Sequence, residues 1–376
     1  MFDVIVSGGG PAGSVAAAVL ARGGARVLLV DRARFPRDKF CGDTVNPGAL
    51  ARLRTLGLDG FATQGLRIAG MIVTGEHGAR IRGAYADGIY GVSILRRDLD
   101  QYLLGAAVHA GARVEEGVLV RGPLLDRESS RPHVRGIVVA GKDGRDVRIP
   151  APLVIAADGR RSRLAVALGL LRTPQRPRRW AVGAYFEGVD AMSACGEMHI
   201  RGGRYLGVAP VPSGLANLCW VSESYVGLAD PAGALWSAIR AIPEVAARCR
   251  DARMVTRPSL MGPLAVDSAG CGVPGLLLAG DAAGFIDPMT GDGLRFAIVG
   301  GELAARAALG ALADGRAAHV RLSRWRRQAF GRKQRFNRVL RALVSLPSGI
   351  TTASAAARVA PWTVRRLVAV AGDVGR

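Results

Sequence analysis

The chain has 376 residues, of which 49% are hydrophobic, and its formal net charge is +21. This length predicts two or three domains with large buried cores. No apolar run approaches the roughly 18 residues of a membrane-spanning helix, which argues against an integral membrane protein. The positive charge could attract nucleic acid, acidic membranes or anionic carriers, but aromatic residues are few and no nucleic-acid-binding motif is present, so no nucleic-acid partner is expected.

The N-terminus indicates the compartment of the protein, and the cysteines indicate whether disulfides or a metal site are expected. The N-terminus starts directly in a strand-like segment without the layout of a signal peptide, which predicts a cytoplasmic protein. The cysteines are odd in number and scattered without CxxC spacing, so neither a disulfide framework nor a zinc site is indicated. They are Cys41, Cys195, Cys219, Cys249 and Cys271. The histidines also lack ligand-like spacing, and no metal site is expected.

A strand–turn–helix–strand unit opens the chain. Residues 2–6 are apolar and β-branched, which predicts a buried strand. A G-x-G-x-x-G motif follows, formed by Gly8, Gly10 and Gly13. Residues 14–22 predict a helix, and residues 25–30 predict a second buried strand that ends at Asp31.

Each part of this unit suits the binding of a dinucleotide. Gly8 permits a tight turn, Gly10 lets a pyrophosphate approach the backbone, and Gly13 lets the helix pack close to the sheet. The helix N-terminus offers free N–H groups and positive partial charge to phosphates. Asp31 can accept hydrogen bonds from ribose hydroxyls. This context favours a dinucleotide site over a glycine-rich turn that has no ligand.

The segment after the second strand carries a longer motif. Residues 35–43 read F-P-R-D-K-F-C-G-D, and residues 47–56 predict a helix. With this motif the chain resembles the geranylgeranyl reductase family of FAD flavoproteins, including its menaquinone-reductase-like bacterial members, which carry F-P-R-x-K-x-C-G followed by Gly or Asp. That family belongs to the larger group built like p-hydroxybenzoate hydroxylase. The resemblance implies an α/β fold: a Rossmann-like FAD-binding domain, an inserted antiparallel-sheet substrate domain and a C-terminal helical segment.

The resemblance predicts three further signatures, and the sequence contains all of them. Residues 95–103 match R-x-x-L-D-x-x-L, which implies that Arg96 touches the ribityl or phosphate region of the flavin. A predicted strand at residues 153–157 leads into a D-G motif that begins at Asp158, whose implied place is near the pyrophosphate. The three signatures, in this order and at long spacing, are much more specific than the glycine motif alone.

The third signature lies near the end of the matching region, which covers about residues 1–315. A predicted strand at residues 275–279 leads to Asp281, which by resemblance accepts from the ribityl hydroxyls. The motif D-P-M-T-G-D-G follows, and a helix then extends to about Leu309. Its N-terminus near Gly293 would point N–H groups at the flavin N1–C2=O edge, where reduced flavin carries negative charge.

The resemblance therefore implies a complete set of FAD contacts, with the adenine contacted by the backbone at Val120. The expected set comprises Gly8, Gly10, Ala12, Gly13, Asp31, Arg32, Cys41, Gly42, Arg96, Val120, Asp158, Asp281, Gly291, Gly293 and Leu294. A second glycine motif is absent, so NAD(P)H is expected only as a transient reductant.

Domain boundaries follow from the order of these motifs. The expected FAD domain comprises residues 1–65, 95–177 and 263–315, and the expected substrate domain comprises residues 66–94 and 178–262. Residues 112–120 and 132–149 alternate apolar and polar positions with glycine turns, which predicts a small antiparallel meander. Strands predicted at residues 180–187, 205–211 and 216–222 would form the sheet of the substrate domain over the flavin.

The chain departs from the family in its predicted pocket. Prenyl reductases commonly show Y-x-W-x-F-P and then N-V-G. Here Tyr205, Pro210 and Asn217 remain, whereas Gly207 and Ala209 replace the tryptophan and the phenylalanine. Smaller side chains would widen the pocket. The W-x-W-x-I-P signature of flavin halogenases is absent, which argues against halogenation.

Three residues are candidates for catalysis. Cys41 could lie beside the isoalloxazine or the substrate, as its motif implies, or it could be an inert buried cysteine. Asp43 could be an acid in the site or the N-cap of the helix that begins at Pro47. Tyr205, like Trp220, could line the pocket or belong to the core.

The last expected segment, residues 316–376, is basic and helical. Residues 319–346 interleave arginines with apolar residues, which predicts a helix with a basic and an apolar face. Such a helix could attach to a membrane surface or pack on the FAD domain with a solvated arginine face, and the second arrangement is favoured. Residues 347–349 would end this helix, and residues 353–370 predict another.

The expected function is that of an FAD-dependent oxidoreductase acting on a hydrophobic isoprenoid, lipid or polyketide-like substrate. The favoured reaction is reduction of C=C bonds by hydride transfer from flavin N5. One alternative is an FAD monooxygenase that uses NAD(P)H and O2 to hydroxylate an aromatic or polyketide product. Another is a non-catalytic flavin electron carrier. One fold hosts both enzymatic reactions, so the fold does not choose between them.

Overall fold

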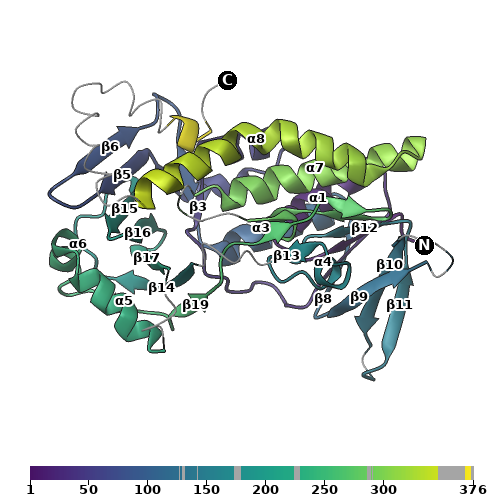
Figure 1. Cartoon of the computed structure of the whole chain (residues 1–376), viewed down its shortest axis with the longest axis horizontal. Coiled ribbons are helices and arrows are strands. Elements are labelled where there is room, and N and C mark those ends of the chain that lie inside the picture. Colours follow the sequence, from purple (N-terminus) through teal and green to yellow (C-terminus); the bar gives the residue numbers. More distant parts are fainter. Residues whose placement is uncertain are drawn as a thin grey trace.

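The computed structural model describes residues 1–126, 128, 132–141, 143–172, 179–223, 229–285, 289, 291–345 and 369–373. Two β-layers occupy opposite ends of an elongated molecule, and the long helix α8 (Ala318–Ser345) runs across both (Figure 1). One layer is a mainly parallel sheet covered by helices, and the other is an antiparallel-rich sheet. The predicted α/β fold is confirmed.

The mainly parallel sheet has six strands, and every neighbouring pair is parallel except the first. Their order is β21 (Gly272–Val273), β22 (Leu276–Leu278), β12 (Leu153–Ala156), β1 (Val4–Ser7), β2 (Val27–Asp31) and β8 (Arg113–Glu116). The central strands are continuous apolar runs because layers cover both of their faces.

Three helices cover one face of this sheet: α1 (Pro11–Arg22), α3 (Arg96–His109) and α7 (Gly293–Asp314). Gly301 of α7 lies so close to α1 that a Cβ there would be 2.1 Å from the carbonyl oxygen of Ala12. In the described part of the chain, α7 alone is long and apolar enough to cross a membrane. Its packing on α1 and α8 explains this apolar character as that of a core helix.

A three-stranded antiparallel meander covers the other face, formed by β9 (Val120–Leu125), β10 (Val134–Ala140) and β11 (Asp146–Pro150). The assignment of residues 112–120 to this meander was wrong. Residues 113–116 form β8, which pairs in parallel with β2. The physical reason is the preceding helix α3, which returns the chain to the sheet edge as a crossover connection does.

The second large sheet has eight strands. They are β18 (Arg253–Met254), β14 (Trp180–Glu187), β17 (Leu215–Ser222), β16 (Arg204–Val211), β15 (Cys195–Arg201), β5 (Gly70–Thr74) and β6 (Arg80–Ala84), with β19 (Ser259–Met261) also paired to β14. Helices α5 (Pro231–Arg240) and α6 (Pro243–Arg248) pack on its outer face. Its inner face meets the rest of the molecule through Leu264, Phe285 and Met289.

Two small sheets connect these layers. Strands β3 (Thr44–Val45), β7 (Gly91–Ser93) and β4 (Leu66–Ile68) form one of them, and β13 (Leu171–Arg172) pairs with β20 (Asp267–Ser268) in the other. Helix α2 (Pro47–Thr55) follows β3 as predicted. Segment 66–94 therefore contributes β5 and β6 to the eight-stranded sheet, whereas β7 pairs on one side with β3, before α2, and on the other side with β4.

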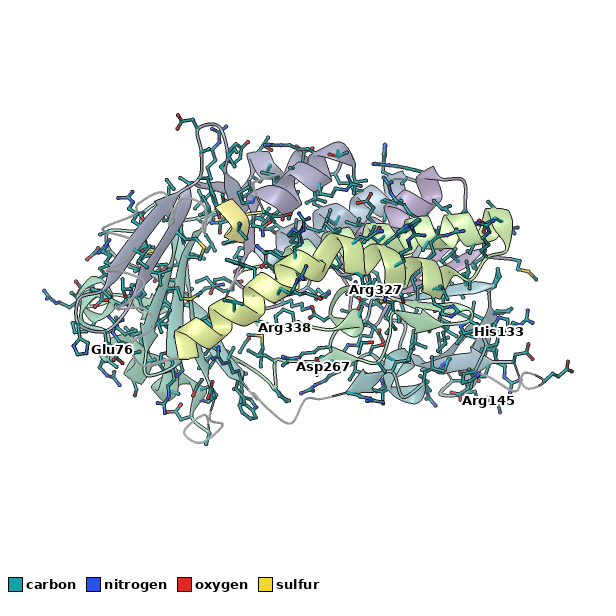
Figure 2. All side chains as sticks on the ribbon, turned by 45° about the horizontal axis from the view of Figure 1, so that its top comes forward. Glu76, His133, Arg145, Asp267, Arg327 and Arg338 are labelled. Atoms are coloured by element: carbon teal, nitrogen blue, oxygen red, sulfur yellow. The ribbon has the colours of Figure 1, made fainter. Side chains whose placement is uncertain are left out.

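Helix α8 has two distinct faces. One side is buried against the body and includes Leu322, Arg326, Phe330, Lys333 and Asn337. The opposite side exposes arginines, two of which are labelled in Figure 2, and the set comprises Arg324, Arg327, Arg332, Arg335 and Arg338. The packed arrangement that the sequence favoured is therefore present. The predicted break at residues 347–349 lies outside the described residues, as does the next predicted helix apart from residues 369–370.

Candidate active site

The predicted cofactor residues meet at one edge of the six-stranded sheet. Gly8 follows β1, Asp31 ends β2, and Asp158 comes two residues after β12. Asp281 lies in the short helix η2 (Gly280–Ala283), which follows β22. Because these four strands are parallel, their carboxyl ends share one edge, where ligands of open α/β sheets bind.

The glycine motif forms a cradle that larger residues would fill. Gly8 has a φ of 106°, and a Cβ at Gly13 would be 1.8 Å from the carbonyl oxygen of Gly8. The side-chain position of Gly10 faces open space, with the Arg37 guanidinium 3.5 Å away. No side chain caps the N-terminus of α1, where Ala12 lies. Its free N–H groups therefore suit a phosphate.

Asp31 is held in place by the backbone. Its two carboxylate oxygens accept from Gly9 N at 2.7 Å and from Ala33 N at 2.8 Å, and each retains a lone pair that a ribose hydroxyl could use. Val118 N donates to the carbonyl oxygen of Asp31 at 2.8 Å, which brings the start of β9 and Val120 beside it. Arg32 is exposed.

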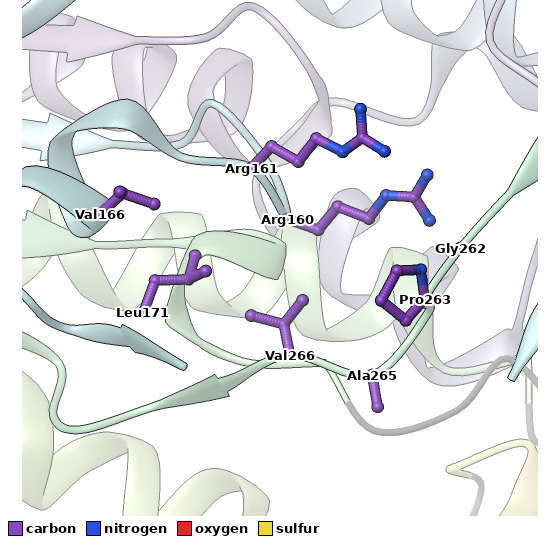
Figure 3. Close-up of a pocket in the computed structure, with 8 residues that line it drawn as sticks. All are labelled: Arg160, Arg161, Val166, Leu171, Gly262, Pro263, Ala265 and Val266. Carbon is purple, nitrogen blue, oxygen red and sulfur yellow. The ribbon is translucent and has the colours of Figure 1, made fainter. Parts of the chain in front are cut away.

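The D-G motif lies between this cradle and a pocket of about 250 Å³ (Figure 3). Asp158 Oδ2 accepts from Arg163 N at 3.1 Å, whereas its buried Oδ1 has no partner among the described residues. Burial is the main cause that raises the pKa of Asp158. Arg160 and Arg161 line the pocket together with Gly262 and Pro263, which follow the last strands of the eight-stranded sheet.

The loop after β2 covers the glycine cradle. A Cβ at Gly9 would be 3.2 Å from the ring of Phe35, and the Arg37 guanidinium lies 4.8 Å from the centre of that ring. Arg37 forms an ion pair with Asp100 at 3.2 Å, but its buried Nε lacks a described partner. A guanidinium with an unfilled donor suits a diphosphate. Arg37 was not among the predicted cofactor residues, although the F-P-R motif contains it.

These features fit the ADP half of FAD. The cradle excludes side chains, acids stand at the strand ends, and unpartnered polar atoms of Arg37 and Asp158 are buried beside them. The flavin half would then extend toward the inner face of the eight-stranded sheet.

Arg96 has partners within the protein. Its guanidinium is buried and forms a two-point pair with Asp100, with both distances 2.8 Å. It also interacts with the thiol of Cys41. Burial opposes its charge, but Asp100 and Cys41 outweigh burial and raise the pKa of Arg96. Arg96 therefore anchors the Cys41 loop to α3, a role that the sequence analysis did not anticipate.

Asp43 is the centre of a buried cluster. Its Oδ2 accepts from the Tyr185 hydroxyl at 2.7 Å and from Asn217 Nδ2 at 2.6 Å, and its Oδ1 accepts from Arg96 N at 3.2 Å. Burial raises the pKa of Asp43 to about 6, although these hydrogen bonds oppose the shift. The N-cap alternative for Asp43 was wrong, because the cap of α2 is Asn46, whose side chain accepts from Ala49 N.

The cysteines of this region lie close to the same cluster. Asn217 also donates to the carbonyl oxygen of Cys41, and a Cβ at Gly42 would meet nothing within 4 Å. Burial, with the nearby charges of Cys41 and Asp43, raises the pKa of Cys219 to about 12. The thiol of Cys219 is therefore held in its neutral form.

Tyr205 lies apart from this cluster. It is buried in a core cluster of the inner face, opposite Val221 of β17, which in turn pairs with Ala181 of β14. Tyr185 stands four residues further along β14. The structure thus brings Cys41 and Asp43 together but does not bring Tyr205 to them.

None of the described side chains caps the N-terminus of α7. Gly291 has a φ of 64°, Gly293 begins the helix and Leu294 is buried. Asp292, the N-cap residue, instead accepts from Asn46 at 3.1 Å and from Asn337 at 3.0 Å. An ion pair with Lys333 of α8 at 3.2 Å completes its contacts. The uncapped N–H groups fit the expected place of the flavin N1–C2=O edge.

Comparison with known proteins identifies the family. Residues 1–229 match the model of an FAD-binding domain. Menaquinone reductase of Mycolicibacterium smegmatis is 31% identical over 327 residues, covering 81% of this chain and 75% of that protein. Digeranylgeranylglycerophospholipid reductase 1 of Methanopyrus kandleri is 31% identical over 336 residues, covering 83% and 82% respectively. This chain belongs to the FAD-binding-domain family of oxidoreductases.

Solved structures of flavoproteins have the same fold. A flavin-dependent brominase superposes with a TM-score of 0.87 at 20% identity, covering 99% of this chain and 93% of that one. A geranylgeranyl bacteriochlorophyll reductase-like protein of Thermoplasma acidophilum gives 0.78 at 23% identity, covering 99% and 91%. These structures show the fold alone. The family match and the reductase relatives show that the chain is an FAD-dependent oxidoreductase, so the predicted family is confirmed, and the FAD-binding domain supports FAD as its cofactor.

Proposed function

We propose that this oxidoreductase reduces C=C bonds of a hydrophobic, isoprenoid-type substrate. FAD, when bound and reduced, supplies hydride from its N5 atom. Two relatives at 31% identity are named as reductases of menaquinone and of a digeranylgeranyl lipid, which supports this reaction class. The absence of the halogenase signature in the sequence is consistent with it.

The observation that carries the proposal is an unfilled region on the inner face of the eight-stranded sheet. Small residues stand there on three neighbouring strands: Gly196, Gly207, Ala209 and Cys219. A Cβ at Gly196 would meet nothing within 4 Å, and the nearest atom to one at Gly207 would be 3.7 Å away. Glycines without packing neighbours leave room for a bulky apolar ligand.

The proposed FAD site combines Asp31 and Gly10 at the ADP end with Asp281 near the ribityl chain. Replacing Asp281 by alanine should weaken FAD binding about tenfold or more, because a charged acceptor of hydrogen bonds is lost. Asp267→Ala is the control, since Asp267 is exposed on β20 (Figure 2). Equal FAD affinity in both variants would contradict the assignment of Asp281.

Anaerobic turnover tests the reaction itself. FAD-loaded protein, reduced with dithionite, is mixed with a menaquinone that carries a geranylgeranyl tail, and the product is analysed by mass spectrometry. We expect flavin reoxidation and, after any quinol has been reoxidised in air, a quinone product whose tail is heavier by two hydrogens, about 2 Da. Product formation only in air with NAD(P)H, with a gain of one oxygen atom, would instead support a monooxygenase. Rapid electron exchange without any product would support a carrier.

The exposed arginines of α8 suggest a surface through which the protein contacts the lipid that contains such a substrate. No acidic residue occurs between positions 315 and 372, and the five exposed arginines have no carboxylate within 4 Å in the described part of the chain. We propose that this face contacts anionic lipid. Sedimentation with phosphatidylglycerol vesicles measures the affinity. In Arg327→Gln/Arg338→Gln the affinity should fall about 30-fold, because each arginine contributes about 1 kcal/mol to binding.

Arg145→Gln is the matched control for vesicle binding, because Arg145 is exposed at the far end of the molecule (Figure 2). Its affinity for the vesicles should equal that of the wild type. Equal binding of all three proteins, or equal binding to neutral phosphatidylcholine vesicles, would contradict a specific role for α8.

A further inference from the structure

We propose that Tyr185 delivers the proton that completes C=C reduction and that buried Asp43 resupplies it. This inference rests on the proposed reductase function and names the residues that act with the flavin. The motifs of the sequence assign no role to Tyr185.

The geometry of the pair carries the inference. Tyr185 lies on β14 and Asp43 lies in the loop before β3, far apart in sequence, yet their side chains share a hydrogen bond of 2.7 Å. The ring of Phe40 packs 5.4 Å from that of Tyr185 and covers Gly183, where a Cβ would be 2.3 Å from the ring. The loop that bears Cys41 and Asp43 is therefore fixed directly on Tyr185.

Tyr185 borders the unfilled region on the inner face of the eight-stranded sheet. In the strand register it is opposite Asn217, and Asn217 is opposite Ala209 of β16. These three residues form one row across the inner face, with Tyr185 at one end and the small residue Ala209 at the other. The side chain of Tyr185 is half-buried, whereas Asp43 is fully buried. Tyr185 can thus contact a ligand that Asp43 cannot reach.

The groups around Asp43 favour a stored proton. Tyr185 and Asn217 face it from the sheet, and the N-terminus of α3 faces it through Arg96 N. The guanidinium of Arg96 is engaged with Asp100, and Cys41 and Cys219 are the neighbouring thiols. Within the described residues no cation forms an ion pair with Asp43. Burial accordingly raises its pKa to about 6, and burial together with Asp43 raises the pKa of Tyr185.

The proton balance is simple. The alkene gains hydride at one carbon, supplied by FAD reduced with a two-electron donor, and the other carbon takes the proton of the Tyr185 hydroxyl. As that O–H bond breaks, the proton of the Asp43 carboxyl passes to the phenol oxygen, and Asp43 later regains a proton from water. The pair is active when Asp43 is protonated, so proton delivery should be greatest well below pH 6 and decline as the pH rises through about 6.

Single-turnover kinetics test the relay. Dithionite-reduced, FAD-loaded protein is mixed anaerobically with the geranylgeranyl menaquinone at several pH values. In Tyr185→Phe we expect an approximately 100-fold slower alkene reduction with unchanged substrate affinity. In Asp43→Asn we expect a slower rate that no longer declines around pH 6. Tyr102→Phe on α3, whose hydroxyl accepts from Gly60 N at 2.9 Å, is the control.

A second readout does not depend on turnover. Infrared titration of the FAD-loaded protein should show a protonated carboxyl band that disappears near pH 6, is absent in Asp43→Asn and changes frequency in Tyr185→Phe. A wild type that reduces no alkene probe would refute the proposed function. Normal rates in Tyr185→Phe, or no such band at any pH from 4 to 8, would refute the relay alone.

Discussion

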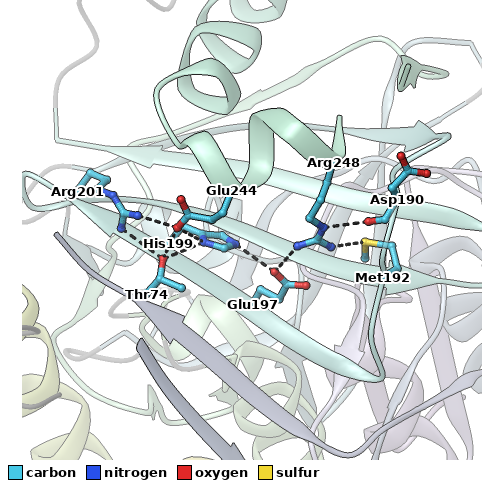
Figure 4. A network of polar contacts seen from close by, with 8 residues as sticks. All are labelled: Thr74, Asp190, Met192, Glu197, His199, Arg201, Glu244 and Arg248. Carbon is cyan, nitrogen blue, oxygen red and sulfur yellow. Dashed lines mark hydrogen bonds and ion pairs between the residues drawn. The ribbon is translucent and has the colours of Figure 1, made fainter. Parts of the chain in front are cut away.

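Two buried carboxylates stand on opposite faces of the eight-stranded sheet, and they differ in their partners. Glu197 of β15 faces α6 on the outer side, where it accepts from Arg248 Nη1 at 2.7 Å and lies 3.2 Å from His199 Nε2 (Figure 4). Asp43 is held against the inner side by Tyr185, Asn217 and a backbone N–H. One carboxylate has a cation, whereas the other has neutral donors.

The difference in partners decides whether the pKa of each carboxylate is raised or lowered. Burial alone would raise both, because it disfavours the charged form. At Glu197 the hydrogen bonds from His199 and Arg248 outweigh burial and lower the pKa. At Asp43 the neutral donors do not, and the pKa rises to about 6.

The outer cluster extends further and is densely connected. Thr74, Arg201 and Glu244 continue the contacts of His199, with Arg201 Nη2 2.7 Å from Glu244 Oε1 (Figure 4). A network whose charges balance stabilises the fold of the sheet against α6. A buried acid without a paired cation can change its protonation during a reaction, and the comparison therefore separates a structural face from a chemical face.

Removing the cation that is paired with Glu197 should have the largest effect. Arg248→Ala leaves Glu197 buried without its guanidinium, and we expect a loss of about 4 kcal/mol in the free energy of unfolding. Urea denaturation of the FAD-loaded protein measures it. Arg253→Ala, which removes an exposed pair with Glu187, should cost less than about 1 kcal/mol. Equal losses in both variants would show that the outer cluster is not a stabilising network.

The two acids should affect stability with opposite dependence on pH. Glu197 has a lowered pKa, so the stability it adds over Glu197→Gln should be present above pH 4.5 and disappear on acidification. Asp43 has a raised pKa, so wild type should lose stability relative to Asp43→Asn as pH rises from about 4 to 6. The two-unit shift corresponds to about 3 kcal/mol at most. Urea denaturation at saturating FAD measures both, and slopes of the same sign would contradict the comparison.

Much of the dinucleotide half could be predicted because its signals are local. Strand, glycine turn, helix and acid follow one another within 31 residues, and the parallel topology then brings Asp158 and Asp281 to the same edge. The assignment of residues 113–116 failed because a short polar strand does not reveal whether its partner is parallel or antiparallel.

The inner-face cluster could not be predicted for a different reason. Asp43 lies 142 positions before Tyr185 and 174 positions before Asn217. The contact between these side chains depends on how the loop that bears Asp43 packs on the sheet. The contact of Asp292 with Asn337 and Lys333 of α8 is equally non-local. Such contacts carry no periodic or spacing signal, whereas the Arg37 site had one in the F-P-R motif.

The smallest expected effect is that of removing one hydroxyl on the outer face. The hydroxyl of Thr74 lies 2.9 Å from His199 Nδ1 and donates to Glu244 at 3.1 Å. Arg201 Nη1 also donates to this hydroxyl, at 3.3 Å. Thr74→Val keeps the shape of the side chain and should cost about 1 kcal/mol in the free energy of unfolding, since these three hydrogen bonds are lost. Urea denaturation measures this cost, and single-turnover kinetics should give the wild-type rate and pH profile. If Thr74→Val shifts the pH profile as Asp43→Asn does, the two faces are coupled, and the chemistry extends through the sheet rather than being confined to its inner side.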